Sequence, residues 1–172
     1  MGMPKATSIG LLVGLVIATG MLSTNSAVLA QPQTCGLLTS DEIQALAPKQ
    51  TVTDAAVSGN QGAGAVGCRY TWGSGVDHFT LTLSARDASR VFAGMNAASA
   101  RQGLLGTVAP GTADEAISDV GEAAVFKSPS SVYATASALA KGRYLQVTLD
   151  GLYARDQKGQ LIALLKSAVS RL

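Results

Sequence analysis

The sequence predicts a single α+β domain in which a mostly antiparallel sheet of about six strands carries three packed helices. Several segments alternate apolar and polar residues with the period of two that marks a half-buried strand, and three others place apolar residues at helical spacing. The order along the chain is helix, three strands, helix, three strands, helix, so the strands fall into two three-stranded groups. Short turns within each group favour antiparallel pairing. We expect the helices to cover one face of the sheet.

The first helix is expected over residues 39–47, "TSDEIQALA". Thr39 is a good N-cap, and Glu42, three residues later, can reach back to the Thr39 backbone N–H and complete a capping box. Pro48 is expected to end the helix, because a proline disfavours helical geometry in the residue before it.

The first strand group covers three segments of unequal strength. Residues 51–58 form a weak strand, and a glycine-rich turn at 59–64 leads to residues 65–72, "AVGCRYTW". Residues 76–85, "VDHFTLTLSA", alternate cleanly and are the clearest half-buried strand of the group.

Two further helices follow the two strand groups. Asp87 is positioned to cap a helix over residues 88–102, and the chain closes on a helix over residues 160–172 with a wide apolar stripe. Lys166 and Arg171 lie near the end of the last helix, where the helix dipole favours cations.

The second strand group comprises residues 120–126, 132–140 and 143–150. The segment 128–131, "SPSS", is expected to interrupt it, and residues 141–142 are expected to form a tight turn between the last two strands. The longest irregular connection, residues 103–119, precedes this group. It is rich in glycine and turn residues, and it is where we expect a functional loop.

The first 30 residues have the three-part order of a secretory signal peptide. Lys5 precedes an apolar run from Ile9 to about Met21, and a polar break then leads to small residues before the expected cut. The apolar core is about 13 residues long, shorter than the roughly 20 residues that a membrane-spanning helix needs. We therefore expect residues 1–30 to be removed. Residues 31–172 would form one exported domain, either periplasmic or secreted.

A lipid-anchored form has to be weighed, because Cys35 lies close to the expected cut. Lipid attachment requires a small residue directly before the cysteine and an apolar residue further upstream. This chain has "PQT" there. The sequence therefore argues against a lipid anchor.

The chain has two cysteines, Cys35 and Cys68, and an even count in an exported chain favours a disulfide. No Cys-x-x-Cys pair is present for redox chemistry, and a single histidine leaves too few Cys and His ligands for a zinc site. In the chain-entropy description, such a disulfide stabilises the fold by roughly 3–4 kcal/mol.

Charge and composition argue against nucleic-acid binding and against a membrane-spanning segment in the mature chain. The 13 Lys and Arg residues nearly balance the 11 Asp and Glu residues, and no basic stripe is present to neutralise phosphates, so nucleic-acid binding is not expected. No segment of the mature chain approaches transmembrane length. Aromatic residues are few, so the core should consist of small and aliphatic side chains.

No catalytic, cofactor-binding or metal-binding set of residues stands out. His78 is the only imidazole, and its neighbour Asp77 should point to the opposite face of a strand, where it cannot orient the ring. Helix capping explains the adjacent acids Asp41 and Glu42. We expect no catalytic residues, no metal and no cofactor.

The candidate binding surface consists of Trp72, Tyr133, Tyr144, Asp114 and Glu115. The aromatic residues fall on predicted strands, with the tyrosines opposite the presumed core and Trp72 either beside them or buried. The two acids lie in the irregular connection. A sheet face bearing tyrosine and threonine can bind a partner or an apolar ligand. The alternative is that helices cover one or both faces and that the tyrosines are edges of the core.

A resemblance to a known group is carried by four segments: "TCGLLTSDEIQALA", "GCRYTW", "VGEAAVF" and "KGRYLQVTL". The chain resembles small exported bacterial proteins and lipoproteins, well represented in actinobacteria and grouped as domains of unknown function. Those proteins open with Cys-x-Leu-Leu-Thr-x-x-Glu and carry a second cysteine before an aromatic strand. The resemblance implies an envelope or secreted domain with a disulfide between Cys35 and Cys68, and it implies no catalytic residues. Many members begin at a lipidated cysteine, whereas this chain lacks that sequence.

Together these observations predict a non-catalytic exported binding or accessory domain, whether periplasmic, envelope-associated or secreted. Its partner would be an unknown protein or a small apolar ligand of the envelope. An alternative is an inhibitor of a secreted or cell-wall enzyme, because small disulfide-linked exported domains suit that role. A third and less favoured alternative is a hydrolase whose site uses dispersed Asp, Ser and Tyr residues.

Overall fold

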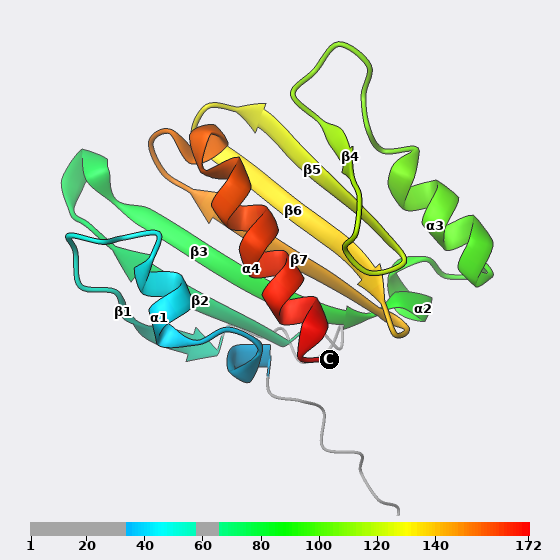
Figure 1. The fold of residues 1–172 in the computed structure, drawn as a ribbon, viewed down its shortest axis with the longest axis horizontal. Coiled ribbons are helices and arrows are strands. Elements are labelled where there is room, and N and C mark those ends of the chain that lie inside the picture. Colours follow the sequence, from blue (N-terminus) through cyan, green and yellow to red (C-terminus); the bar gives the residue numbers. More distant parts are fainter. Residues whose placement is uncertain (1–33, 58–65) are drawn as a thin grey trace, which may run out of the picture.

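The fold is built on one antiparallel sheet, against which the helices pack (Figure 1). The computed structural model describes residues 34–57 and 66–172. The expected signal peptide and the glycine-rich turn at 59–64 lie outside the described residues. Within the described part, no helix is both long enough and apolar enough to cross a membrane.

The described elements are seven strands, four α-helices and three short 3-10 helices. The strands are β1 (Thr53–Val57), β2 (Val66–Trp72), β3 (Phe79–Asp87), β4 (Glu115–Ile117), β5 (Ala123–Ser130), β6 (Tyr133–Ala140) and β7 (Arg143–Asp150). The α-helices are α1 (Ser40–Gln44), α2 (Ala88–Val91), α3 (Ala97–Leu105) and α4 (Lys158–Ser170). The 3-10 helices are η1 (Thr34–Leu37), η3 (Gly75–Asp77) and η4 (Ala154–Gln157).

The two expected strand groups join into one sheet with the order β1-β2-β3-β7-β6-β5-β4. β3 and β7 form the junction, pairing in register from Thr80↔Asp150 to Asp87↔Arg143. The predicted α+β class with a mostly antiparallel sheet is confirmed. The short strand β4 adds to the six strands that were expected, and it lies within the connection predicted to be irregular.

The helix expected over residues 88–102 is in fact two helices. Asp87 caps α2 as predicted, since its Oδ1 accepts a hydrogen bond from the Ser89 backbone N–H at 2.9 Å. α2 ends after one turn because Phe92 leaves the helical region (φ −112°, ψ 51°). The chain then starts α3 with a new N-cap, Asn96.

β5 continues through the segment that was expected to interrupt it. The strand includes Pro129 and ends at Ser130, and its register with β6 shifts between Lys127 and Ser130. Such an irregularity lets a strand hold a residue that has no N–H to donate. Because α3 and β4 occupy the ends of the 103–119 connection, the irregular loop is shorter than predicted and covers residues 106–114.

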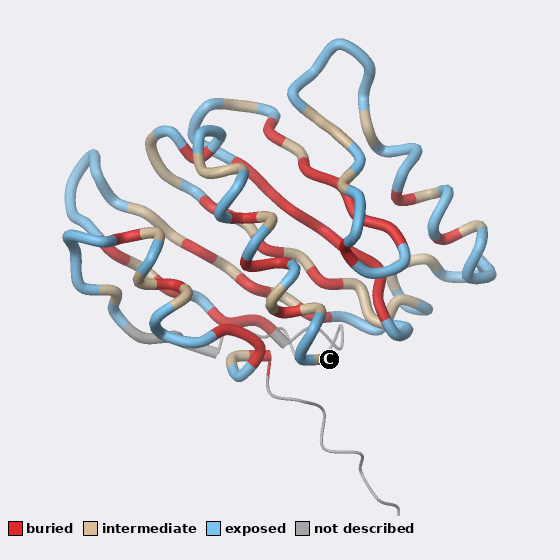
Figure 2. Tube along the Cα trace, in the orientation of Figure 1, coloured by how far each residue is buried: buried red, intermediate tan, exposed pale blue. Residues whose placement is uncertain are grey.

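Helices lie on both faces of the sheet, so the expectation that they cover one face is wrong. α4 packs against β6 and β7 through a buried stripe of Leu161, Leu164, Leu165 and Ala168. α3 packs on the opposite face, where its Leu104 joins Val125 of β5 and Leu139 of β6 in a second buried cluster. β6 is therefore buried along nearly its whole length (Figure 2).

The N-terminal cap of α1 has the predicted capping box. The Glu42 backbone N–H donates to Thr39 Oγ1 at 3.3 Å, and the Thr39 backbone N–H donates to Glu42 Oε2 at 2.8 Å. The helix ends at Gln44, earlier than Pro48 would require.

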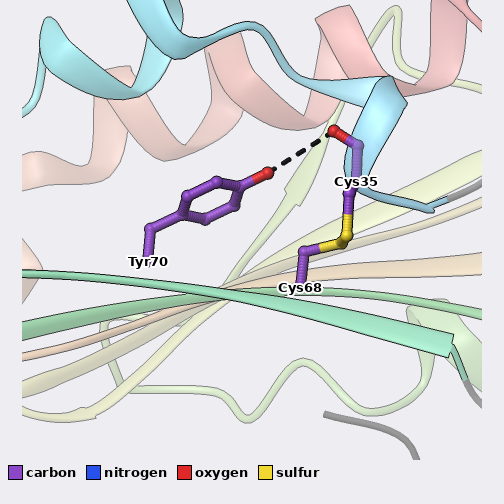
Figure 3. Close-up of a disulfide and its surroundings, with 3 residues drawn as sticks. All are labelled: Cys35, Cys68 and Tyr70. Atoms are coloured by element: carbon purple, nitrogen blue, oxygen red, sulfur yellow. Dashed lines mark hydrogen bonds between the residues drawn. A yellow bond between two sulfur atoms is a disulfide. The ribbon is translucent and has the colours of Figure 1, made fainter. Parts of the chain in front are cut away.

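The predicted disulfide between Cys35 and Cys68 is present (Figure 3). It joins η1 to β2 with a Cα–Cα distance of 5.3 Å, and Cys68 is fully buried. The Tyr70 hydroxyl donates to the Cys35 carbonyl oxygen at 3.5 Å. The disulfide therefore fixes the segment before α1 on the sheet, on the side that α4 covers.

The predicted tight turn between β6 and β7 is also confirmed. Lys141 (φ 48°) and Gly142 (φ 73°) are both in the left-handed region, as a type I′ hairpin turn requires. This turn fixes the β6–β7 register, which runs from Ala140↔Arg143 to Tyr133↔Asp150.

Candidate binding groove

A groove of about 510 Å³ lies on the face of the sheet opposite α4. Strands β5, β6 and β7 form its floor, and its wall comes from α2, α3 and the loop 106–114. Its volume falls within the range of about 300–1,000 Å³ that is typical of small-molecule sites.

Strand alternation places a row of polar side chains on the floor. Thr135 and Ser137 of β6 and Gln146 of β7 line the groove, while the residues between them face α4. Thr135 and Ser137 are only 4% and 2% exposed. Buried hydroxyl groups need hydrogen-bond partners, and at the base of a groove those partners can come from the sheet or from a ligand.

Hydrogen bonds within the sheet hold these hydroxyl groups in place. The Tyr144 hydroxyl donates to Ser137 Oγ at 3.1 Å, and the hydroxyl oxygens of Thr135 and Thr148 lie 3.3 Å apart. A hydroxyl group has one donor and two acceptor positions. The Thr135 and Ser137 hydroxyl groups therefore each keep a hydrogen-bonding position that a ligand can use.

One end of the groove is apolar. Val91, Phe92 and Leu104 face the floor from α2, the turn after it, and α3. The rings of Phe92 and Tyr144 meet edge to face, with centroids 5.8 Å apart and an interplanar angle of 78°. This contact fixes the wall against the floor at a geometry that aromatic pairs favour.

The other end of the groove carries two opposite charges, Asp114 and Lys127. Glu115 opposite Phe126 is the terminal pair of the β4–β5 ladder. Asp114 and Lys127 are the residues just beyond this pair, one on each segment. The Ser128 backbone N–H donates to Asp114 Oδ1 at 3.1 Å and holds that carboxylate in position. The ion pairs formed among the described residues include neither Asp114 nor Lys127.

The structure brings together three of the five residues proposed for the binding surface. Tyr133, Tyr144 and Asp114 all line the groove. Trp72 does not, because it lies on the α4 side, is 4% exposed and stacks on Phe79 with centroids 5.6 Å apart. It lines a smaller pocket of about 210 Å³ beside α1.

Glu115 also lies away from the groove, although it follows Asp114 directly. Its carboxylate pairs with Lys158 at the start of α4, at 2.6 Å. The Lys158 ammonium in turn lies 5.8 Å from the ring centroid of Phe126, which belongs to the α4-side core. Side chains of neighbouring residues on an extended chain point to opposite faces, so Asp114 lies on the groove face of the sheet and Glu115 on the α4 face.

Sequence reasoning missed the floor residues and Lys127. The signal was present in "YATASALA" and "RYLQVTLD", where hydroxyl and amide residues recur at every second position. This alternation identifies a polar sheet face. It does not show that α3 packs beside that face and forms the wall of a groove.

Other titratable groups are placed outside the groove. His78 is exposed beside η3, and its Nε2 lies 3.4 Å from Thr80 Oγ1. Desolvation raises the pKa of Asp150, and the charge of Arg69 opposes this shift. Over residues 34–57 and 66–172, no three His, Cys, Asp or Glu side chains gather as metal ligands would.

Comparisons of the chain with known protein families, with curated proteins and with solved structures found no match. The class of protein is therefore defined by its own fold and groove. It is a disulfide-linked α+β domain whose antiparallel sheet carries a groove with an apolar end and a charged end.

Proposed function

We propose that the protein is a non-catalytic exported binding domain whose ligand occupies the groove between α3, the loop 106–114 and strands β5–β7. The observation that carries this proposal is the composition of the groove. It combines an apolar wall with a few oriented hydroxyl groups at its base. Binding sites for small molecules have this composition, with apolar surface for affinity and few polar groups for orientation.

Export is supported by the disulfide and by the order of the N-terminal residues. Disulfides persist in oxidising compartments and are rare in the cytosol. The likeness of the cysteine-bearing segments to exported actinobacterial proteins points in the same direction. Mass spectrometry of the protein recovered from an expressing bacterium tests this part. We expect a chain that begins at residue 31 in the envelope or culture fluid, and an unprocessed cytoplasmic chain would contradict it.

The groove itself can be tested by filling it. Gln146 lies on the floor, and a tryptophan there would project into the groove and fill part of it. Ser84 provides a matched control, because it pairs with Gln146 in register on the neighbouring strand β3 but does not line the groove. Both positions are half-buried strand sites.

The measurement is fluorescence of the uncharged apolar dye Nile red in solutions of the two variants. We expect wild type and Ser84→Trp to bind the dye equally and Gln146→Trp to lose binding. Circular dichroism establishes that both variants are folded. Equal dye binding by Gln146→Trp and wild type, or no binding by wild type, would overturn the proposal.

A second candidate, an inhibitor of a secreted or cell-wall enzyme, is favoured by a different observation. Three exposed apolar side chains lie in connections between elements at the same end of the sheet: Val76 in η3, Val132 between β5 and β6, and Tyr153 after β7. Thr80, Asp150 and Tyr133 are in register at that end, which places the three connections together. Apolar side chains that gather into one exposed patch mark protein-contact sites. Inhibition of cell-wall hydrolases by wild type but not by Tyr153→Ser would support this candidate.

A further inference from the structure

We infer that the ligand of the groove is a zwitterion with an apolar body, of the kind represented by a short apolar peptide with free termini. This inference rests on the proposed function and adds the chemical class of the ligand. It follows from the two unpaired charges at one end of the groove, the apolar wall at the other, and the distance between them.

The charged end offers one partner for each sign of charge. Asp114 and Lys127 directly follow Glu115↔Phe126, the terminal pair of the β4–β5 ladder, and residues opposite one another on paired strands typically have Cβ atoms about 5 Å apart. Neither belongs to an ion pair formed among the described residues. A ligand whose ammonium and carboxylate groups lie a few ångströms apart can contact both.

A ligand with a single charge fits this end poorly. An anion bound at Lys127 would lie against the fixed carboxylate of Asp114, and a cation bound at Asp114 would lie against the ammonium of Lys127. In either case one protein charge would lose water without gaining a partner, which is costly. A zwitterion pairs both charges, so neither Asp114 nor Lys127 is left without a partner of opposite charge.

The body of the ligand must be apolar, because the groove leads from the charges to an apolar wall. Val125 lies two residues before Lys127 on β5 and faces the same groove, a distance of about 7 Å along the strand. Beyond it lie Phe92 and Leu104. On the floor between the two ends, Thr135 and Ser137 offer hydroxyl groups to a peptide bond.

Four peptides with the same apolar body separate the possible classes of ligand. Leucyl-phenylalanine is a zwitterion, its N-acetyl form is an anion, its C-terminal amide is a cation, and the doubly blocked form is neutral. We expect the zwitterion to bind the wild-type protein at least about tenfold more tightly than the other three, as loss of a charged hydrogen bond implies. Isothermal titration calorimetry measures the four affinities.

Two substitutions test the protein side. Lys127→Met keeps most of the side-chain stem, and Asp114→Asn keeps an oxygen that can accept the Ser128 N–H. We expect each to weaken zwitterion binding about tenfold and to remove the preference over one singly blocked form. Lys166→Met on α4 and Asp156→Asn on η4 are controls that change the same charges elsewhere and should leave binding unchanged.

The result that overturns this inference is distinct from failure of the proposed function. Equal binding of all four peptides, no effect of the two substitutions, or no peptide binding at millimolar concentration would overturn the zwitterionic class. Nile red binding that Gln146→Trp abolishes would then still establish the groove as a binding site. If Gln146→Trp binds Nile red as well as wild type does, the proposed function fails as well.

Discussion

Arg171, at the end of α4, forms a two-bond ion pair with Glu42, in the first turn of α1. Arg171 Nη1 donates to Glu42 Oε2 at 2.7 Å, and Nη2 donates to Oε1 at 2.9 Å. The Ser167 hydroxyl donates to the same carboxylate at 2.6 Å. Because Glu42 also completes the cap of α1 through Thr39, one side chain joins the start of the fold to its end.

The first prediction concerns acid stability. Hydrogen bonds from Arg171, then from Ser167 and Thr39, lower the pKa of Glu42 from 4.5 to about 2, against an opposing effect of burial. A lowered folded-state pKa stabilises the protein above the unfolded-state pKa, and this contribution is lost as the pH falls from about 5 towards 2. After allowance for solvent screening, the contribution should be about 1–2 kcal/mol at pH 7.

Glu42→Gln should therefore lower the free energy of unfolding by about 1–2 kcal/mol at pH 7, by about half of that at pH 3, and by little at pH 2. Urea denaturation at a series of pH values measures this difference. Asp41→Asn is the control, because Asp41 is exposed in the same helical turn and is not part of the contact with α4. An equal loss at pH 7 and pH 3 would contradict the prediction.

The second prediction concerns the disulfide. Cys35 and Cys68 are 33 residues apart, and opening a loop of that length should lower the free energy of unfolding by about 3–4 kcal/mol. Denaturation of the wild-type protein with and without dithiothreitol measures the effect. The double variant Cys35→Ala with Cys68→Ala should resemble the reduced protein and be insensitive to dithiothreitol. An unchanged midpoint on reduction would show that the disulfide is not stabilising.

The third prediction compares two glycines with the same backbone conformation. Gly121 (φ 61°) and Gly75 (φ 59°) are both left-handed, but a Cβ on Gly121 would collide with the Leu139 carbonyl oxygen, whereas a Cβ on Gly75 has no neighbour within 4 Å. Gly75→Ala should cost about 1 kcal/mol, as the backbone conformation alone implies. Gly121→Ala should cost about 2 kcal/mol or more, because the carbonyl of β6 has to move as well. Equal losses in thermal denaturation would refute the role of the collision.

The fourth prediction is a stabilising change at the β6–β7 turn. Lys141 adopts φ 48°, a conformation that asparagine tolerates better, and Asn-Gly is the preferred pair for a type I′ turn. Lys141→Asn should raise the free energy of unfolding by about 0.5 kcal/mol. The bond from the residue 141 backbone N–H to Glu122 Oε1 (3.1 Å) does not depend on the side chain and should persist. Lys141→Ala is the control and should give no gain in melting temperature.

Local patterns predicted most of the strands and caps correctly. Leu145, Val147 and Leu149 alternate with polar residues and are all buried on the α4 side, as a period of two requires. The errors occurred where non-local contacts decide. Residues 115–117 form a strand because β5 offers a free edge, and a search for local periodicity cannot detect that edge.

The candidate site was predicted only in part, for the same reason. The sequence placed Tyr133 and Tyr144 on one sheet face correctly, since side chains alternate along a strand. It grouped Asp114 with Glu115, which the structure assigns to opposite faces. Trp72 was included because it is aromatic, whereas its packing on Phe79 buries it.

The sequence by itself determined most of the strand segments, which side chains share a face along them, where α1 is capped, and that two cysteines were available to pair. These properties depend on residues a few positions apart or on composition alone. Only the tertiary structure decided that β3 pairs with β7, that α3 lies on the face opposite α4, and that Phe92, Lys127 and Tyr144 meet around one groove. The physical reason is that these arrangements are selected by the burial of apolar surface between distant segments, a property of the whole chain that no local period records.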